Sequence, residues 1–204
     1  TDEEINSTIK VMGGEDWENW VSLLDKQNLL APNFKTVAFS YIGPDLTKAL
    51  YREGTIGRAK AHLESTANTI HALVNQNPRL RGDGSGGAWI SVNKAVVTQA
   101  SSAIPVVGLY MSILFRIMNN RDDNESTCAQ AIRLFHDYLM HPSPIKTDAA
   151  RRIRLDNFEM LTEVQEQVEA IWGDITNDNL GELADWPYFK NEFGRLFGFN
   201  LNEI

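Results

Sequence analysis

The segment VAFSYIGPDLTKALYREGTIGRAKAHLE, residues 37–64, decides the fold. An apolar run at 35–41 is rich in β-branched and aromatic residues and is followed by Ile-Gly-Pro, which predicts a buried strand. After Gly54, apolar residues recur at helical spacing until Pro78, which predicts a long helix over 54–77.

The predicted helix carries a lysine on its apolar side. The apolar stripe consists of Ile56, Leu63, Ala67, Ile70 and Val74. Lys60 lies four residues after Ile56 and three before Leu63, so it points along this stripe. A lysine in such a position is costly unless it has a partner or a function.

Two tyrosines lie near this lysine in the sequence. Tyr51 falls in the turn before the helix, and Tyr41 ends the predicted strand, where α/β sheets place their ligands. A phenol and an ammonium group titrate near pH ~10, but an adjacent ammonium stabilises the phenolate and makes the phenol a better proton donor. A structural interpretation stays open: an aromatic strand end, a tyrosine in a turn and a lysine that reaches solvent.

A second strand is predicted within 88–98, and the run VVTQASSAIP, 96–105, follows from it. Its free backbone N–H groups and Thr98 could bind an amide or a phosphate. Alternatively, the run is only the N-cap of the apolar helix predicted over 104–118. The polar loop at 79–87 contains GDGSGG but opens a strand instead of a helix, so it is not expected to bind phosphate.

The remaining pattern predicts two strands among about seven helices. The other helices are expected at 2–11, 15–27, 127–140, 158–172 and 187–197, and residues 46–51 are expected to form a short helical or turn segment. Both strands are apolar on both faces, as parallel strands inside an α/β sheet are. Two strands cannot cover this many helices, so further strands are expected from another segment or another chain.

Composition excludes some functions. A net charge of -8 argues against an electrostatic nucleic-acid binder. Cys128 is the only cysteine, and the most apolar segment, 103–115, is too short to span a membrane, so a cytoplasmic protein is expected. The four histidines show no metal-ligand spacing, and no metal is expected.

Several motifs together resemble one family. SYIGP at 40–44, the Tyr51-x8-Lys60 pair and VNKAVVTQASSAIP at 92–105 are similar to trans-2-enoyl-CoA reductases and the related V-type enoyl-acyl-carrier-protein (ACP) reductases. These are enlarged short-chain dehydrogenase/reductases. MGGEDWENW, YREGTIGRAKAHLE and FKNEFGRLFGF are similar to the same family, so the resemblance covers essentially the whole chain.

The resemblance implies a fold and a domain organisation. The fold would be α/β, a Rossmann-like short-chain dehydrogenase/reductase fold. Residues 1–204 would be its helix-rich C-terminal half, with few strands of the parallel sheet and with the catalytic and substrate-binding residues. The glycine-rich turn of the dinucleotide-binding half has no match here, so that N-terminal half is expected outside this chain, as its partner.

The resemblance also implies an activity. The enzyme would use NADH to reduce the trans-2 double bond of an enoyl-CoA or enoyl-ACP to the saturated acyl thioester, in fatty acid synthesis. Tyr51 would donate a proton to the thioester carbonyl, with Tyr41 assisting and lining the substrate site. Lys60 would bind the nicotinamide ribose.

Three further positions follow from the resemblance. Val97 and Thr98 would bind the nicotinamide carboxamide and the diphosphate, and Ile104 would border the acyl channel. Two alternatives to an active enzyme piece stay open. The chain could be an inactive fragment that binds no cofactor, or a helical interaction module without chemistry.

Overall fold

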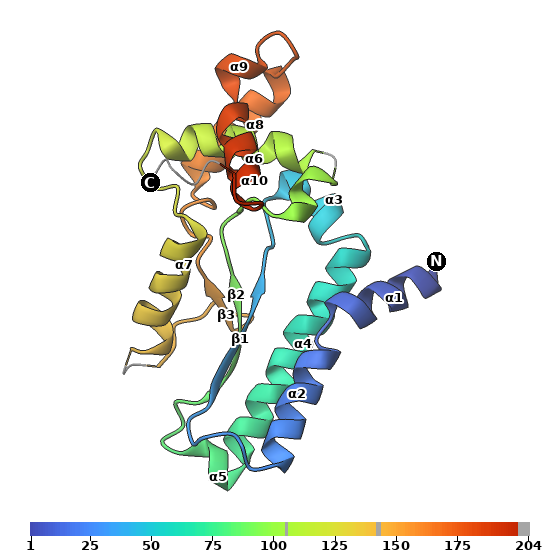
Figure 1. The fold of residues 1–204 in the computed structure, drawn as a ribbon, viewed down its shortest axis with the longest axis vertical. Coiled ribbons are helices and arrows are strands. Elements are labelled where there is room, and N and C mark those ends of the chain that lie inside the picture. Colours follow the sequence, from blue (N-terminus) through green and yellow to red (C-terminus); the bar gives the residue numbers. More distant parts are fainter. Residues whose placement is uncertain (105, 142–143, 200–204) are drawn as a thin grey trace. The chain divides into compact units, whose positions relative to one another are not determined.

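The computed structural model describes residues 1–104, 106–141 and 144–199 and divides the chain into two compact units (Figure 1). Unit 1 comprises Thr1–Asn93 and Ala131–Leu155, and unit 2 comprises Lys94–Gln130 and Asp156–Ile204. Pro105, expected near a helix start, lies outside the described residues.

Unit 1 is built on a parallel sheet in the order β1-β2-β3. The strands are β1 (Lys35–Ser40), β2 (Gly87–Val92) and β3 (Arg152–Arg154). β1 and β2 pair in parallel over their full length, which confirms the α/β prediction. The expected count of two strands was wrong, because β3 is a three-residue Arg-Ile-Arg segment whose polar sequence carries no strand signal.

The two predicted strands differ in burial. Every residue of β2 is buried, as predicted for a central parallel strand. β1 is less buried, and Phe39 is 64% exposed, so the prediction of two buried faces was wrong for this strand. β1 ends the sheet order, so its outer edge has no neighbouring strand among the described residues.

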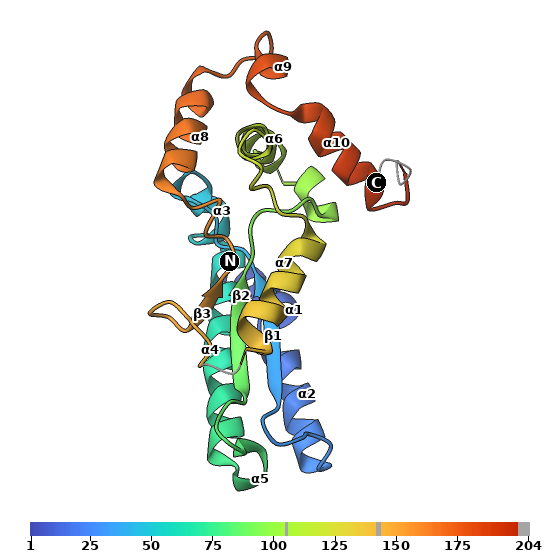
Figure 2. The ribbon, with the colours of Figure 1, turned by 90° about the vertical axis from the view of Figure 1, so that its left-hand side faces the viewer.

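Helices cover both faces of the sheet in unit 1 (Figures 1 and 2). On one face lies α4 (Thr55–Gln76), whose Ala67, Ile70 and Val74 are buried and belong to the core clusters that include β2. Around α4 are α1 (Asp2–Met12), α2 (Glu15–Lys26), α3 (Lys48–Tyr51) and α5 (Pro78–Arg81). The apolar stripe read from the sequence is therefore the side of α4 that packs on the sheet.

The other face is covered by a helix that changes type. α7 (Thr127–Arg133) continues as the π-helical segment η3 (Leu134–Leu139), where a single α-helix over 127–140 was predicted. Leu134 packs with Trp89 and Ile153 of the sheet. A periodicity of apolar residues does not separate α from π winding, so the sequence could not show this change.

Unit 2 is helical. Figure 2 shows α6 (Val107–Asn119) nearly end-on, with α8 (Thr162–Asp174) on one side and α10 (Trp186–Arg195) on the other. A 3₁₀ turn, η2 (Gln99–Ser102), precedes α6, and the short α9 (Leu180–Leu183) precedes α10.

Several predicted boundaries in this region were wrong by a few residues. The helix predicted from 104 begins at Val107, and the helix predicted from 158 begins at Thr162. The strand predicted within 88–98, followed by a turn, is β2 and ends at Val92. α5 and α9 were not predicted, because four-residue helices carry no periodicity. Among the described helices, none has the length and apolarity that crossing a membrane requires.

Candidate active site

The chain turns sharply after β1 and places Tyr41 at the end of the strand. Gly43 has a left-handed φ of 70°, and a Cβ there would meet Thr47 Oγ1 and the Tyr41 ring. The buried Thr47 hydroxyl donates to the Pro44 carbonyl at 3.2 Å, which closes the turn. The sequence Gly-Pro after the strand is therefore what holds the Tyr41 ring close to this turn.

Tyr51 is brought to Tyr41 by the junction between α3 and α4. The two rings pack edge to face with their centroids 4.9 Å apart. Tyr51 is the last residue of α3, and a Cβ on the buried Gly57 of α4 would overlap the backbone of Arg52. Glycine at this position therefore allows the junction to lie directly against the first turn of α4.

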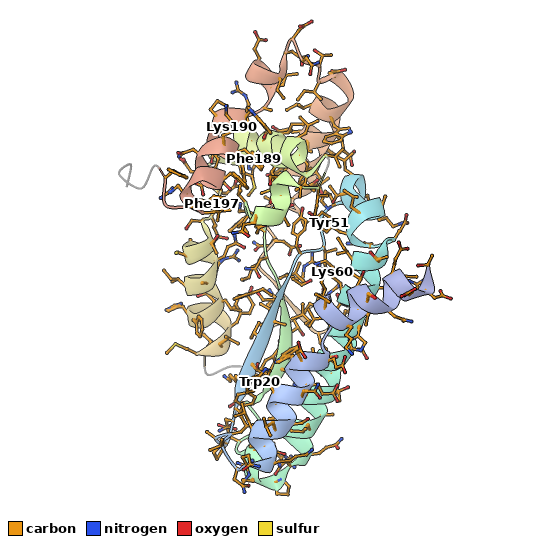
Figure 3. The ribbon with its side chains drawn as sticks, turned by 45° about the vertical axis from the view of Figure 1, so that its right-hand side comes forward. Trp20, Tyr51, Lys60, Phe189, Lys190 and Phe197 are labelled. Atoms are coloured by element: carbon orange, nitrogen blue, oxygen red, sulfur yellow. The ribbon has the colours of Figure 1, made fainter. Side chains whose placement is uncertain are left out.

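Lys60 completes the cluster (Figure 3). Its Nζ lies 6.0 Å from the centroid of the Tyr51 ring and donates to Ser40 Oγ at 3.2 Å. Burial lowers the pKa of Lys60, and the carboxylate of Glu64 partly opposes this shift. The lysine thus lies half-buried between the last residue of β1 and the phenol that precedes its helix.

The structure brings together three of the predicted site residues: Tyr41, Tyr51 and Lys60. They lie at the carboxyl end of a parallel strand, where α/β proteins bind ligands. A proton donor beside an ammonium group suits chemistry in which negative charge develops on a carbonyl oxygen. Ser40 was not predicted, although its place at the end of the strand was the available signal.

Unit 2 contains the other predicted positions. Thr98 caps η2, because its N–H donates to Ser101 Oγ at 3.0 Å and its hydroxyl lies 3.2 Å from the same atom. Thr98 therefore caps this 3₁₀ turn and not the apolar helix, because the N-cap of α6 is Val106, which makes no side-chain capping bond. The backbone N–H groups of Val96 and Val97 have no hydrogen-bond partner among the described residues, so they can donate to a ligand. That Val97 and Thr98 bind the same ligand as Tyr51 stays a prediction, because they belong to a different unit.

Ile104 borders an apolar cleft of about 690 Å³ between η2, α6 and α10. Trp186 and Phe189 stack on its α10 side with ring centroids 5.1 Å apart. The exposed Lys190 is the one charged side chain among the described residues that line it, and Figure 3 shows it beside Phe189. The cleft has the lining expected for an acyl chain, and its α10 wall was not predicted.

Sequence comparison finds relatives that match this chain over its full length. Residues 1–140 match the profile described as the trans-2-enoyl-CoA reductase catalytic region, and residues 147–204 match one described as an enoyl reductase FAD-binding domain. The chain is 48% identical over 204 residues to a trans-2-enoyl-CoA reductase [NADH] of Clostridium perfringens, covering 100% of this chain and 50% of that protein. It is 48% identical over 200 residues to an enoyl-[acyl-carrier-protein] reductase [NADH] of Flavobacterium johnsoniae, covering 98% of this chain and 49% of that protein.

Solved structures agree with these sequence relatives. The trans-2-enoyl-CoA reductase of Clostridium acetobutylicum in complex with NAD superposes with a TM-score of 0.92 at 40% identity, over 100% of this chain and 51% of that chain. The Treponema denticola enzyme in complex with NAD gives 0.90 at 41% identity, over 100% and 49%. The chain therefore spans about half the length of the proteins it matches.

The described residues of 147–199 do not fit a flavin dinucleotide, despite the description of the second profile. A dinucleotide diphosphate is usually held at a glycine-rich turn that follows a strand and opens a helix. The segment from β3 to α8 contains no glycine. The glycines further on are Gly173, Gly181, Gly194 and Gly198, and none of them joins a strand to a helix.

Proposed function

This chain belongs to the trans-2-enoyl-CoA reductase family, and we propose that it forms the C-terminal catalytic part of an NADH-dependent enoyl-thioester reductase. Such an enzyme reduces the trans-2 double bond of an enoyl-CoA or enoyl-ACP, a step of fatty acid synthesis. The dinucleotide-binding half would be a separate part of the same enzyme, since the matched relatives are about twice as long. A cytoplasmic location stays a prediction.

The cluster of Tyr51, Lys60 and Ser40 is the observation that carries this proposal. The half-buried Lys60 ammonium donates to the neutral Ser40 hydroxyl and has further N–H donors for the hydroxyls of a ribose. The unpaired N–H groups of Val96 and Val97 suit a carboxamide oxygen. Taken unit by unit, the Lys60 ammonium of unit 1 suits a ribose, the Val96 and Val97 amides of unit 2 suit a carboxamide, and the lining of the Ile104 cleft in unit 2 suits an acyl chain.

The chemistry needs one proton donor at the carbonyl oxygen of the substrate. When bound, NADH supplies the hydride that is added to the β-carbon. Negative charge then moves through the α-carbon to the thioester oxygen as an enolate, to which Tyr51 donates its phenolic proton. Lys60 stabilises the phenolate that remains. The α-carbon then takes up one proton from solvent while the enol oxygen returns its proton to the Tyr51 phenolate, which gives the saturated thioester and restores Tyr51.

An assay of NADH oxidation tests the proposal in the full-length enzyme that contains this chain. We expect oxidation that depends on crotonyl-CoA or crotonyl-ACP, and comparing the two identifies the thioester carrier. No enoyl-dependent oxidation with either substrate contradicts the proposed activity.

Fluorescence titration separates the two alternatives that the sequence left open. If this chain alone binds NADH, it is not an inert fragment. If it does not bind NADH but the full-length enzyme does, the adenosine-binding half is required. A helical module without chemistry predicts that neither preparation binds NADH.

A further inference from the structure

Lys94 is a buried cation to which the proposed chemistry gives no role. It is 2% exposed and belongs to unit 2. Its Nζ donates to Asn124 Oδ1 at 2.6 Å and to the Ala95 carbonyl at 2.9 Å. The same atom lies 5.3 Å from the centroid of the Phe115 ring, a cation–π contact. Three separate segments of unit 2 therefore hold this ammonium group.

The backbone of the same segment is held by buried side chains. The Lys94 N–H donates to Gln130 Oε1 at 2.9 Å, and the Ala95 N–H donates to Glu159 Oε2 at 2.7 Å. Gln130 and Glu159 are both fully buried, and Glu159 Oε1 accepts the Tyr110 hydroxyl at 2.7 Å. Side chains here replace the strand partners that end at Val92, so the path of the chain is fixed at Lys94 and Ala95.

The next residues are fixed at their other end as well. Thr98 is tied to Ser101 through two contacts of 3.0 and 3.2 Å. Val96 and Val97, which lie between these two anchors, present N–H groups that no described residue accepts. A short segment clamped at both ends presents its donors in a fixed direction, and this lowers the entropic cost of binding a ligand.

We propose that Lys94 is a positioning residue for the nicotinamide. Its ammonium group links the carbonyl of the next residue, Ala95, to Asn124, and this contact orients the Val96–Val97 amides that bind the carboxamide. The inference rests on the proposed function, because it needs NADH as the ligand. Lys94 itself does not touch the cofactor. Its effect passes through the backbone between it and Thr98.

The charges around Lys94 make the arrangement sensitive to pH. Burial lowers the pKa of Lys94 to about 8, opposed by Glu159, Glu125, Asp123 and Glu192. The charged or titratable groups that share its pocket also include Arg195 and Tyr188, and burial raises the pKa of Tyr188. Lys94 is therefore expected to lose its charge as the pH rises through about 8.

The test compares NADH affinity in full-length variants. Lys94→Met keeps the length of the side chain and removes its charge and donors. We expect NADH to bind at least about tenfold more weakly, which is the usual effect of losing hydrogen bonds made by a charged group. Lys26→Met, which removes an exposed lysine of α2, is the matched control and should bind NADH normally.

Two further readouts separate positioning from a general structural effect. In the unaltered enzyme NADH affinity should fall as the pH rises through about 8, and Lys94→Met should lose this part of the pH profile while keeping any part due to Lys60. Hydrogen exchange at residues 95–97 should be faster in Lys94→Met. If Lys94→Met does not fold, Asn124→Ala removes the acceptor from a half-exposed position and should change affinity in the same direction.

The outcomes are distinct. If the unaltered enzyme does not bind NADH, the proposed function fails and this inference fails with it. If it binds NADH and Lys94→Met binds equally well with the same pH profile, only this inference is overturned. If Lys94→Met binds NADH more weakly but its affinity still falls through the same pH step near 8, the substitution has caused a packing defect, and the inference is also overturned.

Discussion

Lys60 shows how a lysine that interrupts an apolar stripe can reach a hydrogen-bond partner. Its ammonium group reaches the Ser40 hydroxyl and lies beside the Tyr51 ring, while Ala67 and Ile70 pack on the sheet about two and three turns further along α4. The sequence predicted that Lys60 needs a partner, but it could not identify Ser40, because that contact depends on where the helix lies against the strand.

Replacing Tyr51 by phenylalanine tests the proton donor directly. We expect turnover of the enoyl thioester to fall by about 10²- to 10⁴-fold, the usual range for loss of a general acid. The edge-to-face contact with Tyr41 is retained, so the thermal unfolding temperature should change little. Tyr138→Phe, in η3 on the other face of the sheet, is the control, and near-normal turnover of Tyr51→Phe would exclude the assigned role.

Replacing Lys60 by alanine tests the cofactor contact. NADH binding should weaken by at least about tenfold, since the lost partner is a charged donor. The exposed Lys10 of α1 provides the control variant, Lys10→Ala. An unchanged NADH dissociation constant for Lys60→Ala, measured by fluorescence titration, would count against the contact with the ribose.

At the scale of elements, the sequence predicts long and strongly periodic segments well. α4 was expected over 54–77 and spans Thr55–Gln76, because its apolar residues repeat every three or four positions. The sequence did not predict β3, because Ile153 is the only apolar residue of this strand. β3 is defined by its pairing with β2, which no local pattern shows. Tertiary contacts determine whether such short elements form, so the sequence pattern alone cannot predict them.

The junction of α3 and α4 provides a prediction about packing. Gly57→Ala places a methyl group against the backbone of Arg52, and overpacking of this kind costs about 1–3 kcal/mol. The substitution should lower the free energy of unfolding and also reduce turnover, because it displaces Tyr51. Denaturant unfolding and the NADH oxidation assay measure the two effects.

A second glycine serves as the matched control. Gly173 lies inside α8, and a Cβ there would meet nothing within 4 Å. Gly173→Ala should therefore be neutral or stabilise the protein by up to about 1 kcal/mol through helix propensity. If Gly57→Ala and Gly173→Ala change the free energy of unfolding equally, the close approach of Gly57 to the Arg52 backbone does not require glycine.

For the whole molecule, the candidate site was only partly accessible to prediction. The motif Tyr-x8-Lys identified the chemistry of unit 1, and the structure confirms that its residues meet. The Lys94 network was not predicted, although VNKAVV carries the same signal as Lys60, a lysine within an apolar run. Its partners Asn124 and Glu159 are distant in the sequence, so no local pattern could connect them.

Unit 1 exposes apolar side chains that a further part of the enzyme would cover. Phe39 on β1 is 64% exposed, Trp20 on α2 is 64% exposed, and Ile132 on α7 is 69% exposed. We expect this chain alone to bind a dye for exposed apolar surface and to self-associate at high concentration. Phe39→Ser should reduce both the dye binding and the self-association. If native mass spectrometry shows only monomers and the chain binds no dye, a missing partner is not needed.

The contacts of the two candidate regions differ in how far they reach along the chain, and this has a consequence for the order of folding. The bond from Lys60 to Ser40 spans 20 positions, whereas the bond from Ala95 to Glu159 spans 64. Short loops close at a lower entropic cost, so the tyrosine–lysine cluster should acquire protection before the turn at 94–98 does. In pulse-labelled refolding, amides near Tyr51 should be protected first, and the segment proposed to bind the nicotinamide should be the last part of the catalytic region to mature.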